Sequence, residues 1–266
     1  MIVLLRKEET VSTIDERRER ASAGVALAPE RDGWYGDFAR PRVFLQPIAA
    51  PSILGLAGFS VATMMVATIQ AGWWGTLDDL TIVAPFAAFF GGLAQFMAGM
   101  WSYRARDAIA TLAHGTWGAF WMAFGLLEIL IAAHVLPAPV PDAVNIPFGL
   151  WFIGLAYITG SAAVASLTKG LGLFAVLSTL AVGSAFTAIG LLTGGFTSGW
   201  THAGGWLFVF SAGFAWYMVT AMLLLASSGR TILPMGEYKK AANVPGKEPT
   251  RPIELEWAEP GVKMGQ

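Results

Sequence analysis

Long apolar runs alternate with short polar breaks along this chain. Six runs reach the length of about 20 mainly apolar residues that a helix needs to span a bilayer. They cover residues 53–74, 81–102, 109–133, 147–168, 171–193 and 203–226. The breaks between them contain the glycines, prolines and polar residues that end helices. The pattern predicts an all-α, polytopic membrane protein with six transmembrane helices.

The two ends of the chain have a different pattern. Residues 1–46 and 239–266 are charged and contain proline, and they show no sustained helical or strand period. We therefore predict two tails around a six-helix membrane domain at 47–238. Residues 14–23 fit either a short helix or a solvated segment, and the sequence leaves this open.

Charge is scarce where the apolar runs lie. The chain is 55% hydrophobic and 13% charged, whereas soluble domains carry about 25% charged residues. From residue 53 to 227 the charged residues are Asp78, Asp79, Arg104, Arg106, Asp107, Glu128, Asp142 and Lys169. So few charges cannot cover a water-exposed surface, which makes this an integral membrane protein.

The positive charges fall on one side of the predicted topology. All 17 lysines and arginines lie before the first span, in the second and fourth breaks, or after the last span. The other three breaks contain no lysine or arginine, and their charged residues are Asp78, Asp79 and Asp142. The positive-inside rule then predicts that both termini are cytoplasmic, in a cell membrane that is the inner or plasma membrane.

Three spans carry pairs of glycines seven residues apart, close to two helical turns, so each pair lies on one helix face. The pairs are Gly92 and Gly99, Gly118 and Gly125, and Gly183 and Gly190. Small residues let helices approach closely in lipid. The faces pack either within one protomer or between protomers.

The third span carries a stripe of chemistry-bearing residues. His114, Trp117, Trp121 and Glu128 recur at helical spacing. This fits either a narrow path with an aromatic waist or aromatic packing in the core. Glu128 is the one acidic residue that lies within a predicted span. An ionisable residue inside the membrane suggests a function, although Glu128 lies near the predicted outer end of its span, where its side chain could snorkel to the interface.

Two polar residues in other spans have similar alternatives. Gln95, in the middle of the second span, suits either a solute path or a hydrogen bond between helices. His202 opens the sixth span near the outer face, where helix N-terminal dipoles attract anions. No nucleotide-binding, metal-ligand or hydrolase motif is visible. We expect a protein that is not an enzyme and has no cofactor, metal or nucleic-acid partner.

Four motifs, in order, resemble those of the acetate uptake transporter family. They are FFGGLAQFMAGMWSYR from Phe89, TWGAFWMAFG from Thr116, THAGGW from Thr201 and GRTILPMGE from Gly229. The resemblance covers residues 47–238. It departs at the first span, where the family reads N-P-A-P-L-G-L and this chain reads Ala50-Pro51-Ser52-Ile53-Leu54-Gly55-Leu56. Because of this change, the resemblance does not identify the ligand of this chain.

The resemblance implies a homo-oligomer, a hexamer of six-helix protomers, each with its own path through a hydrophobic constriction. The matching constriction residues are Phe59, Trp117 and Leu180. Along the path we expect an outer vestibule near His202 and Glu128 and an inner exit. The other expected path residues are Pro51, Ser52, Gln95, His114 and Trp121.

The function implied is transport, by channel or symport with H⁺, of a small monocarboxylate such as acetate, with succinate as a further candidate. Two alternatives stay open. One is permeation of another small solute such as ammonia, which the altered first-span motif allows. The other is a membrane sensor or scaffold that does not transport, which the long charged N-terminal tail allows.

Overall fold

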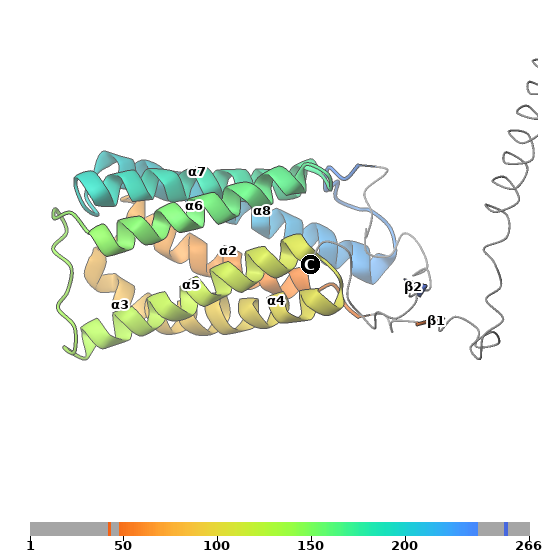
Figure 1. The fold of residues 1–266 in the computed structure, drawn as a ribbon, viewed down its shortest axis with the longest axis horizontal. Helices are drawn as coiled ribbons and strands as arrows, with labels where there is room; N and C mark the ends of the chain where they lie inside the picture. Colours follow the sequence, from red (N-terminus) through yellow and green to blue (C-terminus); the bar gives the residue numbers. More distant parts are fainter. Residues whose placement is uncertain (1–41, 44–47, 239–252, 255–266) are drawn as a thin grey trace, which may run out of the picture. The chain divides into compact units, whose positions relative to one another are not determined.

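The computed structural model describes residues 42–43, 48–238 and 253–254. Residues 48–238 form a bundle of helices that run alongside one another (Figure 1). Its helices are α2 (Pro51–Gln70), α3 (Leu80–Phe86), α4 (Gln95–Arg104), α5 (Ala108–Ala132), α6 (Ile146–Ser166), α7 (Leu171–Thr193) and α8 (Gly199–Ser228). A 3₁₀ turn, η1 (Leu77–Asp79), precedes α3, and a π-helical segment, η2 (Ala87–Ala94), joins α3 to α4.

A separate unit of the chain contains a short antiparallel strand pair, β1 (Arg42–Val43) with β2 (Ile253–Glu254). Arg42 pairs with Glu254 and Val43 with Ile253. Residues 14–23, for which the sequence left a short helix or a solvated segment open, lie outside the described residues, as does most of both predicted tails. The predicted division at 46 and 239 therefore stays a prediction.

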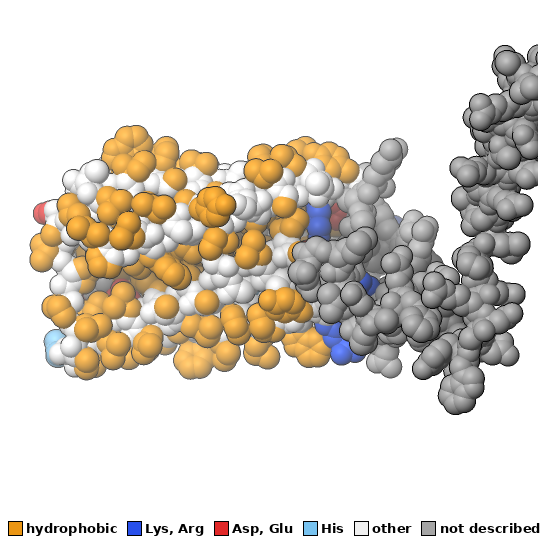
Figure 2. All heavy atoms as spheres, in the orientation of Figure 1, with side chains coloured by type: hydrophobic (Ala, Val, Ile, Leu, Met, Phe, Trp, Pro, Cys, Tyr) orange, Lys and Arg blue, Asp and Glu red, His pale blue; other side chains and the backbone are white. Residues whose placement is uncertain are grey.

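The predicted six-span membrane topology is confirmed. Six helical stretches are long and apolar enough to cross a bilayer: 51–70, 77–104, 108–132, 146–166, 171–193 and 199–228. The fifth span matches its predicted limits, whereas the first ends four residues earlier than predicted and the sixth begins four earlier. Hydrophobic side chains dominate the face of the bundle that Figure 2 shows, as expected for a surface in contact with lipid.

Local sequence explains where the helices start and stop. Asp107, Asn145 and Ser198 are N-caps whose side-chain oxygens accept hydrogen bonds from the backbone N–H groups of Ala110, Phe148 and Trp200. Gly229 ends α8 with φ 68°, a left-handed conformation that glycine adopts without steric cost.

The second span is the irregular one. Pro85 lies inside α3, and its ring and missing N–H disturb the helical ladder. The eight π-helical residues of η2 follow directly, and π segments are rare and frequent at functional sites. The predicted span at 81–102 is confirmed within 77–104, and the π-helical segment inside it is a feature that the sequence did not predict.

Neighbouring helices in the bundle follow the order α6, α7, α8, α2, with α5 also contacting both α2 and α6. The second span packs against α2 and α5. The buried apolar core draws on α2, α5, α6, α7 and α8, and on the second span through Leu80, Val83 and Ala87, so all six spans contribute to a common centre.

The glycine pairs pack within the chain. A Cβ on any of these six glycines would come within 3.0 Å of another helix, and for Gly118 the nearest atom is the backbone nitrogen of Phe96. Gly183 faces the ring of Phe208, and Gly190 faces Thr201. Of the two alternatives, packing inside one protomer is therefore the one observed.

The two ends of the bundle differ in charge (Figure 2). One end carries the described lysine and arginine side chains of the bundle, and we call it the basic end: Arg104, Arg106, Lys169 and Arg230. The opposite end, which we call the acidic end, carries Asp78, Asp79 and Asp142.

Candidate functional site

Five aromatic rings close the centre of the bundle, and we call them the aromatic waist: Phe59, Trp117, Phe120, Phe152 and Phe208. Four of them form a closed cycle in which neighbouring ring centroids lie 5.2, 5.7, 6.2 and 6.3 Å apart, in the order Trp117, Phe120, Phe152, Phe208 and back to Trp117. The ring of Phe59 meets Trp117 edge-on at 6.1 Å. All five side chains are buried, so the waist is shut in this conformation.

Trp117 is the centre of the waist. Its exposed fraction is 3%, and it contacts the rings of Phe59, Phe120 and Phe208. Its indole Nε1–H donates to Thr159 Oγ1 of α6 at 3.0 Å. This hydrogen bond fixes the indole plane and ties α5 to α6.

The three predicted constriction residues come from three helices and lie in one buried core. Phe59 and Leu180 are each 2% exposed, and both belong to the same apolar cluster as Trp117. Their role as a constriction for a solute stays a prediction. Sequence reasoning missed Phe120, Phe152 and Phe208. Phe120 lies in the TWGAFWMAFG motif three residues after Trp117, whereas the signal of Phe152 and Phe208 was their aromatic character within a span.

A cavity of about 420 Å³ opens on the acidic side of the waist. Most of its wall is apolar, and Phe120 and Phe152 of the waist form part of it. The lining residues are Val66, Ile69, Gln70, Gly72, Gly75, Thr76, Leu77, Asp78, Leu80, Phe120, Phe124, Pro141, Phe148, Phe152, Thr187, Phe196, Thr197, Thr201 and His202. No lysine or arginine is among them.

Gln70, at the last turn of α2, ties three helices together at this cavity. Its Nε2 donates to Thr187 Oγ1 of α7 at 2.8 Å and to the carbonyl oxygen of Thr201 of α8 at 2.9 Å. A carbonyl oxygen can only accept, so the amide nitrogen must face it. Thr201 Oγ1 in turn donates to the carbonyl of Gly195 at 2.8 Å.

Loop contacts close the acidic end over the cavity. The backbone N–H of Phe196 donates to the carbonyl of Pro141 at 2.8 Å. The hydroxyl of Thr197 donates to the carboxylate of Asp142. These bonds join the α5–α6 loop to the α7–α8 loop beside His202, which the cavity reaches.

The predicted inner exit lies on the other side of the waist. The imidazole of His114 fills the space beside Gly55 of α2, where a Cβ would lie 2.6 Å from the ring. Pro51 and Ser52 begin α2, and both are half-buried. Pro51, Ser52 and His114 are not among the residues that line the cavity of about 420 Å³, so their place on a solute path stays a prediction.

Four buried polar atoms lack a hydrogen-bond partner among the described residues: Thr63 Oγ1, Gln95 Oε1, His114 Nδ1 and Trp121 Nε1. Gln95 and Trp121 lie where the second span packs, since Gly58 meets Gln95 and Gly91 meets Trp121. No hydrogen bond from Gln95 to another helix is found in the described chain, which argues against the interhelical alternative. An unpaired buried polar group is costly to keep.

Glu128 is buried near the end of α5, one helical turn beyond Phe124, which lines the cavity. Its exposed fraction is 8%, whereas a snorkelling side chain would be exposed. Glu128 is not among the cavity-lining residues, so the structure does not bring it together with His202 in one vestibule.

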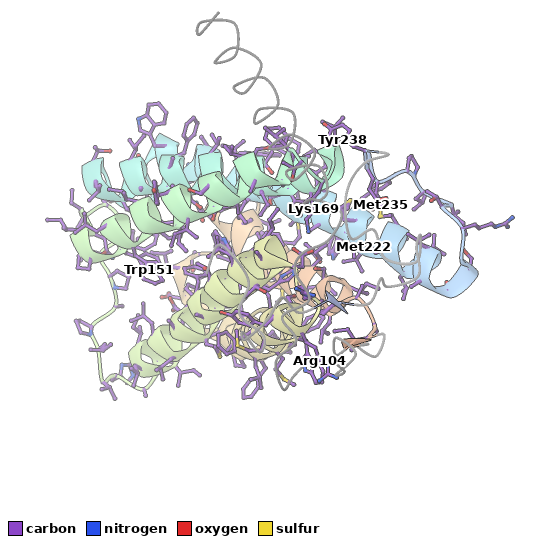
Figure 3. All side chains as sticks on the ribbon, turned by 45° about the vertical axis from the view of Figure 1, so that its right-hand side comes forward. Arg104, Trp151, Lys169, Met222, Met235 and Tyr238 are labelled. Carbon is purple, nitrogen blue, oxygen red and sulfur yellow. The ribbon has the colours of Figure 1, made fainter. Side chains whose placement is uncertain are left out.

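The GRTILPMGE motif forms a strap across the start of α7. The backbone N–H groups of Leu171 and Gly172 donate to the carbonyls of Gly236 and Met235 at 3.0 and 3.2 Å. These bonds satisfy N–H groups that a helix N-terminus leaves free. Met235, 5% exposed, anchors the strap, and Figure 3 shows Met235 and Lys169 at this same end of the bundle.

An ion pair joins two turns at the basic end. Lys169 Nζ lies 2.7 Å from Asp107 Oδ2, and both side chains are about one quarter exposed. Asp107 also caps α5 through its other oxygen. The strap and this pair fix the start of the two helices that carry Leu180 and Trp117.

Residues 39–237 match the model of the GPR1/FUN34/yaaH family. The chain is similar to the succinate-acetate/proton symporter SatP of Escherichia coli, with 27% identity over 71% of this chain and 96% of that protein. It is 30% identical to ammonia transport outward protein 2 of Saccharomyces cerevisiae, over 69% of this chain and 65% of that protein. Acetate permease A of Emericella nidulans is 25% identical, over 80% and 74%.

The fold is also similar to a solved structure described as that of the bacterial acetate channel SatP. The TM-score is 0.62 and the identity 27%, and the match covers 71% of this chain and 100% of the other. The six-span bundle is therefore the fold of a known membrane channel.

Proposed function

Because the chain belongs to the GPR1/FUN34/yaaH family, as the sequence motifs indicated, we propose that it transports a small monocarboxylate such as acetate across a cell membrane. The observation that carries the proposal is the cavity of about 420 Å³ that ends on the aromatic waist. A two-carbon acid fits this volume with room for water, and the apolar wall suits its methyl group.

The route runs from the cavity through the waist. Phe59, Trp117 and Leu180 form the barrier at which the solute loses its water, and this dehydration disfavours large or strongly hydrated solutes. Beyond the waist the solute leaves past His114 towards Pro51 and Ser52. The shut waist opens by side-chain motion around Trp117, whose ring contacts are edge-on rather than stacked.

In this proposal the basic end lies in the cytoplasm, as the positive-inside rule predicts, and the cavity then faces outward. We propose that transport is coupled to H⁺, because the similar bacterial protein is a succinate-acetate/proton symporter. Assembly into a homohexamer would follow the family resemblance. The protein catalyses no covalent reaction in this account.

Ammonia is the second candidate solute, because a yeast relative is an ammonia transport protein. The cavity favours the acid, since most of its wall is apolar and ammonia has no apolar part to place there. The sensor or scaffold alternative predicts instead that the role of the protein depends on its charged N-terminal tail.

Uptake of labelled acetate by cells that lack their own acetate carriers tests the proposal. Cells expressing the full chain should accumulate acetate faster than cells with empty vector, and removal of residues 1–40 should leave most of that uptake. Uptake equal to the empty vector, from protein present in the membrane, would refute transport of acetate. Uptake that disappears with the tail would favour the sensor or scaffold.

A further inference from the structure

The hydrogen bonds of Gln70 decide what its side chain can offer to a ligand. Both amide N–H groups are used, one by Thr187 Oγ1 at 2.8 Å and one by the Thr201 carbonyl at 2.9 Å. The oxygen Oε1 therefore remains, and it can only accept. Gln70 lines the cavity, and Oε1 is not one of the enclosed unpaired atoms of the core.

Thr187 offers the complementary group. Its Oγ1 accepts from Gln70, so its own hydroxyl hydrogen is free to donate. Other threonines in the spans, such as Thr179 and Thr193, donate to a carbonyl of their own helix. In the described part of the chain the Thr187 hydroxyl has no such acceptor, and Thr187, 3% exposed, also lines the cavity.

An acceptor and a donor therefore stand side by side in the cavity wall, one hydrogen bond apart. A protonated carboxyl group carries the matching pair, an O–H that donates and a C=O that accepts. A carboxylate carries two acceptors, and one of them would face the Gln70 oxygen without a proton between them.

The charges around the cavity also favour the neutral acid over the carboxylate anion. Asp78 lines the cavity, and no lysine or arginine does. A carboxylate anion entering an apolar cavity needs a compensating charge, and a nearby aspartate opposes it. Among the lining residues, His202 is the one that can carry positive charge. It directly follows Thr201, whose carbonyl accepts a hydrogen bond from Gln70, so its contribution is tested separately below.

We propose that Gln70 and Thr187 form a binding site for the neutral, protonated carboxyl group of the acid, with the O–H donating to Gln70 Oε1 and Thr187 donating to the C=O. This site rests on the proposed function, and it adds the chemical form in which the substrate is bound. It also disfavours a dicarboxylate dianion, because two carboxylates would meet Asp78 with no lysine or arginine beside them.

Acetamide is the probe that isolates this recognition. It has the shape of acetic acid, a C=O that accepts and an N–H that donates, and it stays neutral at every working pH. Saturation-transfer NMR on the purified full-length protein measures its binding without requiring transport. Wild-type protein should bind acetamide equally at acidic and neutral pH, and acetate should displace it better at acidic pH.

Matched threonine variants give the decisive comparison. Thr187→Val keeps the shape and removes the hydroxyl, and it should weaken acetamide binding about tenfold, the usual effect of leaving a buried polar group unpaired. Thr187→Ser should restore binding, and Thr193→Val, an exposed position on the same helix, should bind as wild type.

Several outcomes would overturn the site. These are no acetamide binding to folded wild-type protein, equal binding by Thr187→Val, or a loss that Thr187→Ser does not restore. Loss of acetate binding in His202→Gln with no competition by acetamide would show an anion held by imidazolium. Acetamide binding that follows the prediction in a protein without acetate uptake would uphold the site and refute the proposed function.

Discussion

Shortening Trp117 to alanine should change which acids pass the waist. The indole is 3% exposed and contacts three aromatic rings at 5.2 to 6.3 Å, and its N–H bonds to Thr159. Truncating a buried tryptophan costs about 3–5 kcal/mol in contacts and cavity. If one third of this free energy acts on the barrier to permeation at the waist, the selectivity between acids shifts by about 1.4 kcal/mol, which is a tenfold change in relative rate.

The assay is the initial rate of uptake of acetate, propionate, butyrate and valerate by proteoliposomes. Wild-type rates should fall steeply as the acid lengthens. Trp117→Ala should raise the ratio of butyrate to acetate uptake by about tenfold, because the space of the indole admits the longer chain. Trp117→Phe keeps an aromatic ring in place and should keep the wild-type order.

Trp151 provides the matched control. It lies on α6 on the outside of the bundle (Figure 3), with 46% of its surface exposed, so Trp151→Ala should leave the order of rates unchanged. Size-exclusion profiles of the detergent-solubilised variants check that each is folded. An unchanged butyrate-to-acetate ratio in folded Trp117→Ala would refute the assignment of Trp117 to the barrier.

Two further predictions concern assembly of the bundle. Gly58→Ala should lower the free energy of unfolding of the purified protein by about 1–3 kcal/mol, because the added Cβ would meet the carbonyl oxygen of Phe90 in the π-helical segment. Gly154→Ala, whose Cβ would have no atom within 4 Å, should leave stability unchanged. Equal melting temperatures for the two variants would contradict the close packing. Asp107→Ala should destabilise more than Lys169→Ala. The partly exposed ion pair contributes about 1 kcal/mol, and Asp107 also caps α5, for about 1 kcal/mol more. Equal losses in thermal unfolding would show that the cap contributes nothing.

The spans could be predicted from the sequence because hydropathy and the bilayer thickness fix their number and length. The fifth span even matched at both ends, since Gly170 and Gly194 bound a mainly apolar run without a charged residue. The π-helical segment could not be predicted, because Pro85 signals a disturbance without saying how the chain resolves it. The contacts of neighbouring helices with Gly91 and Gly92 determine the backbone conformation of this segment, and those contacts are tertiary.

The waist was predictable in part. Trp117 stood out by its spacing and by its motif, but its aromatic partners come from other helices, and no local pattern shows which rings will meet. Gln70 and Thr187 were missed for the same reason. One retrospective signal exists: Thr187 lies seven residues after Leu180, on the same face of α7.

Labelled acetate uptake into proteoliposomes, with and without an inward proton gradient, tests the central claim most directly. The account predicts saturable uptake that rises with the gradient, is inhibited by propionate and acetamide, and is little affected by succinate or ammonium. Uptake no greater than in liposomes without protein, from a folded preparation, would contradict it.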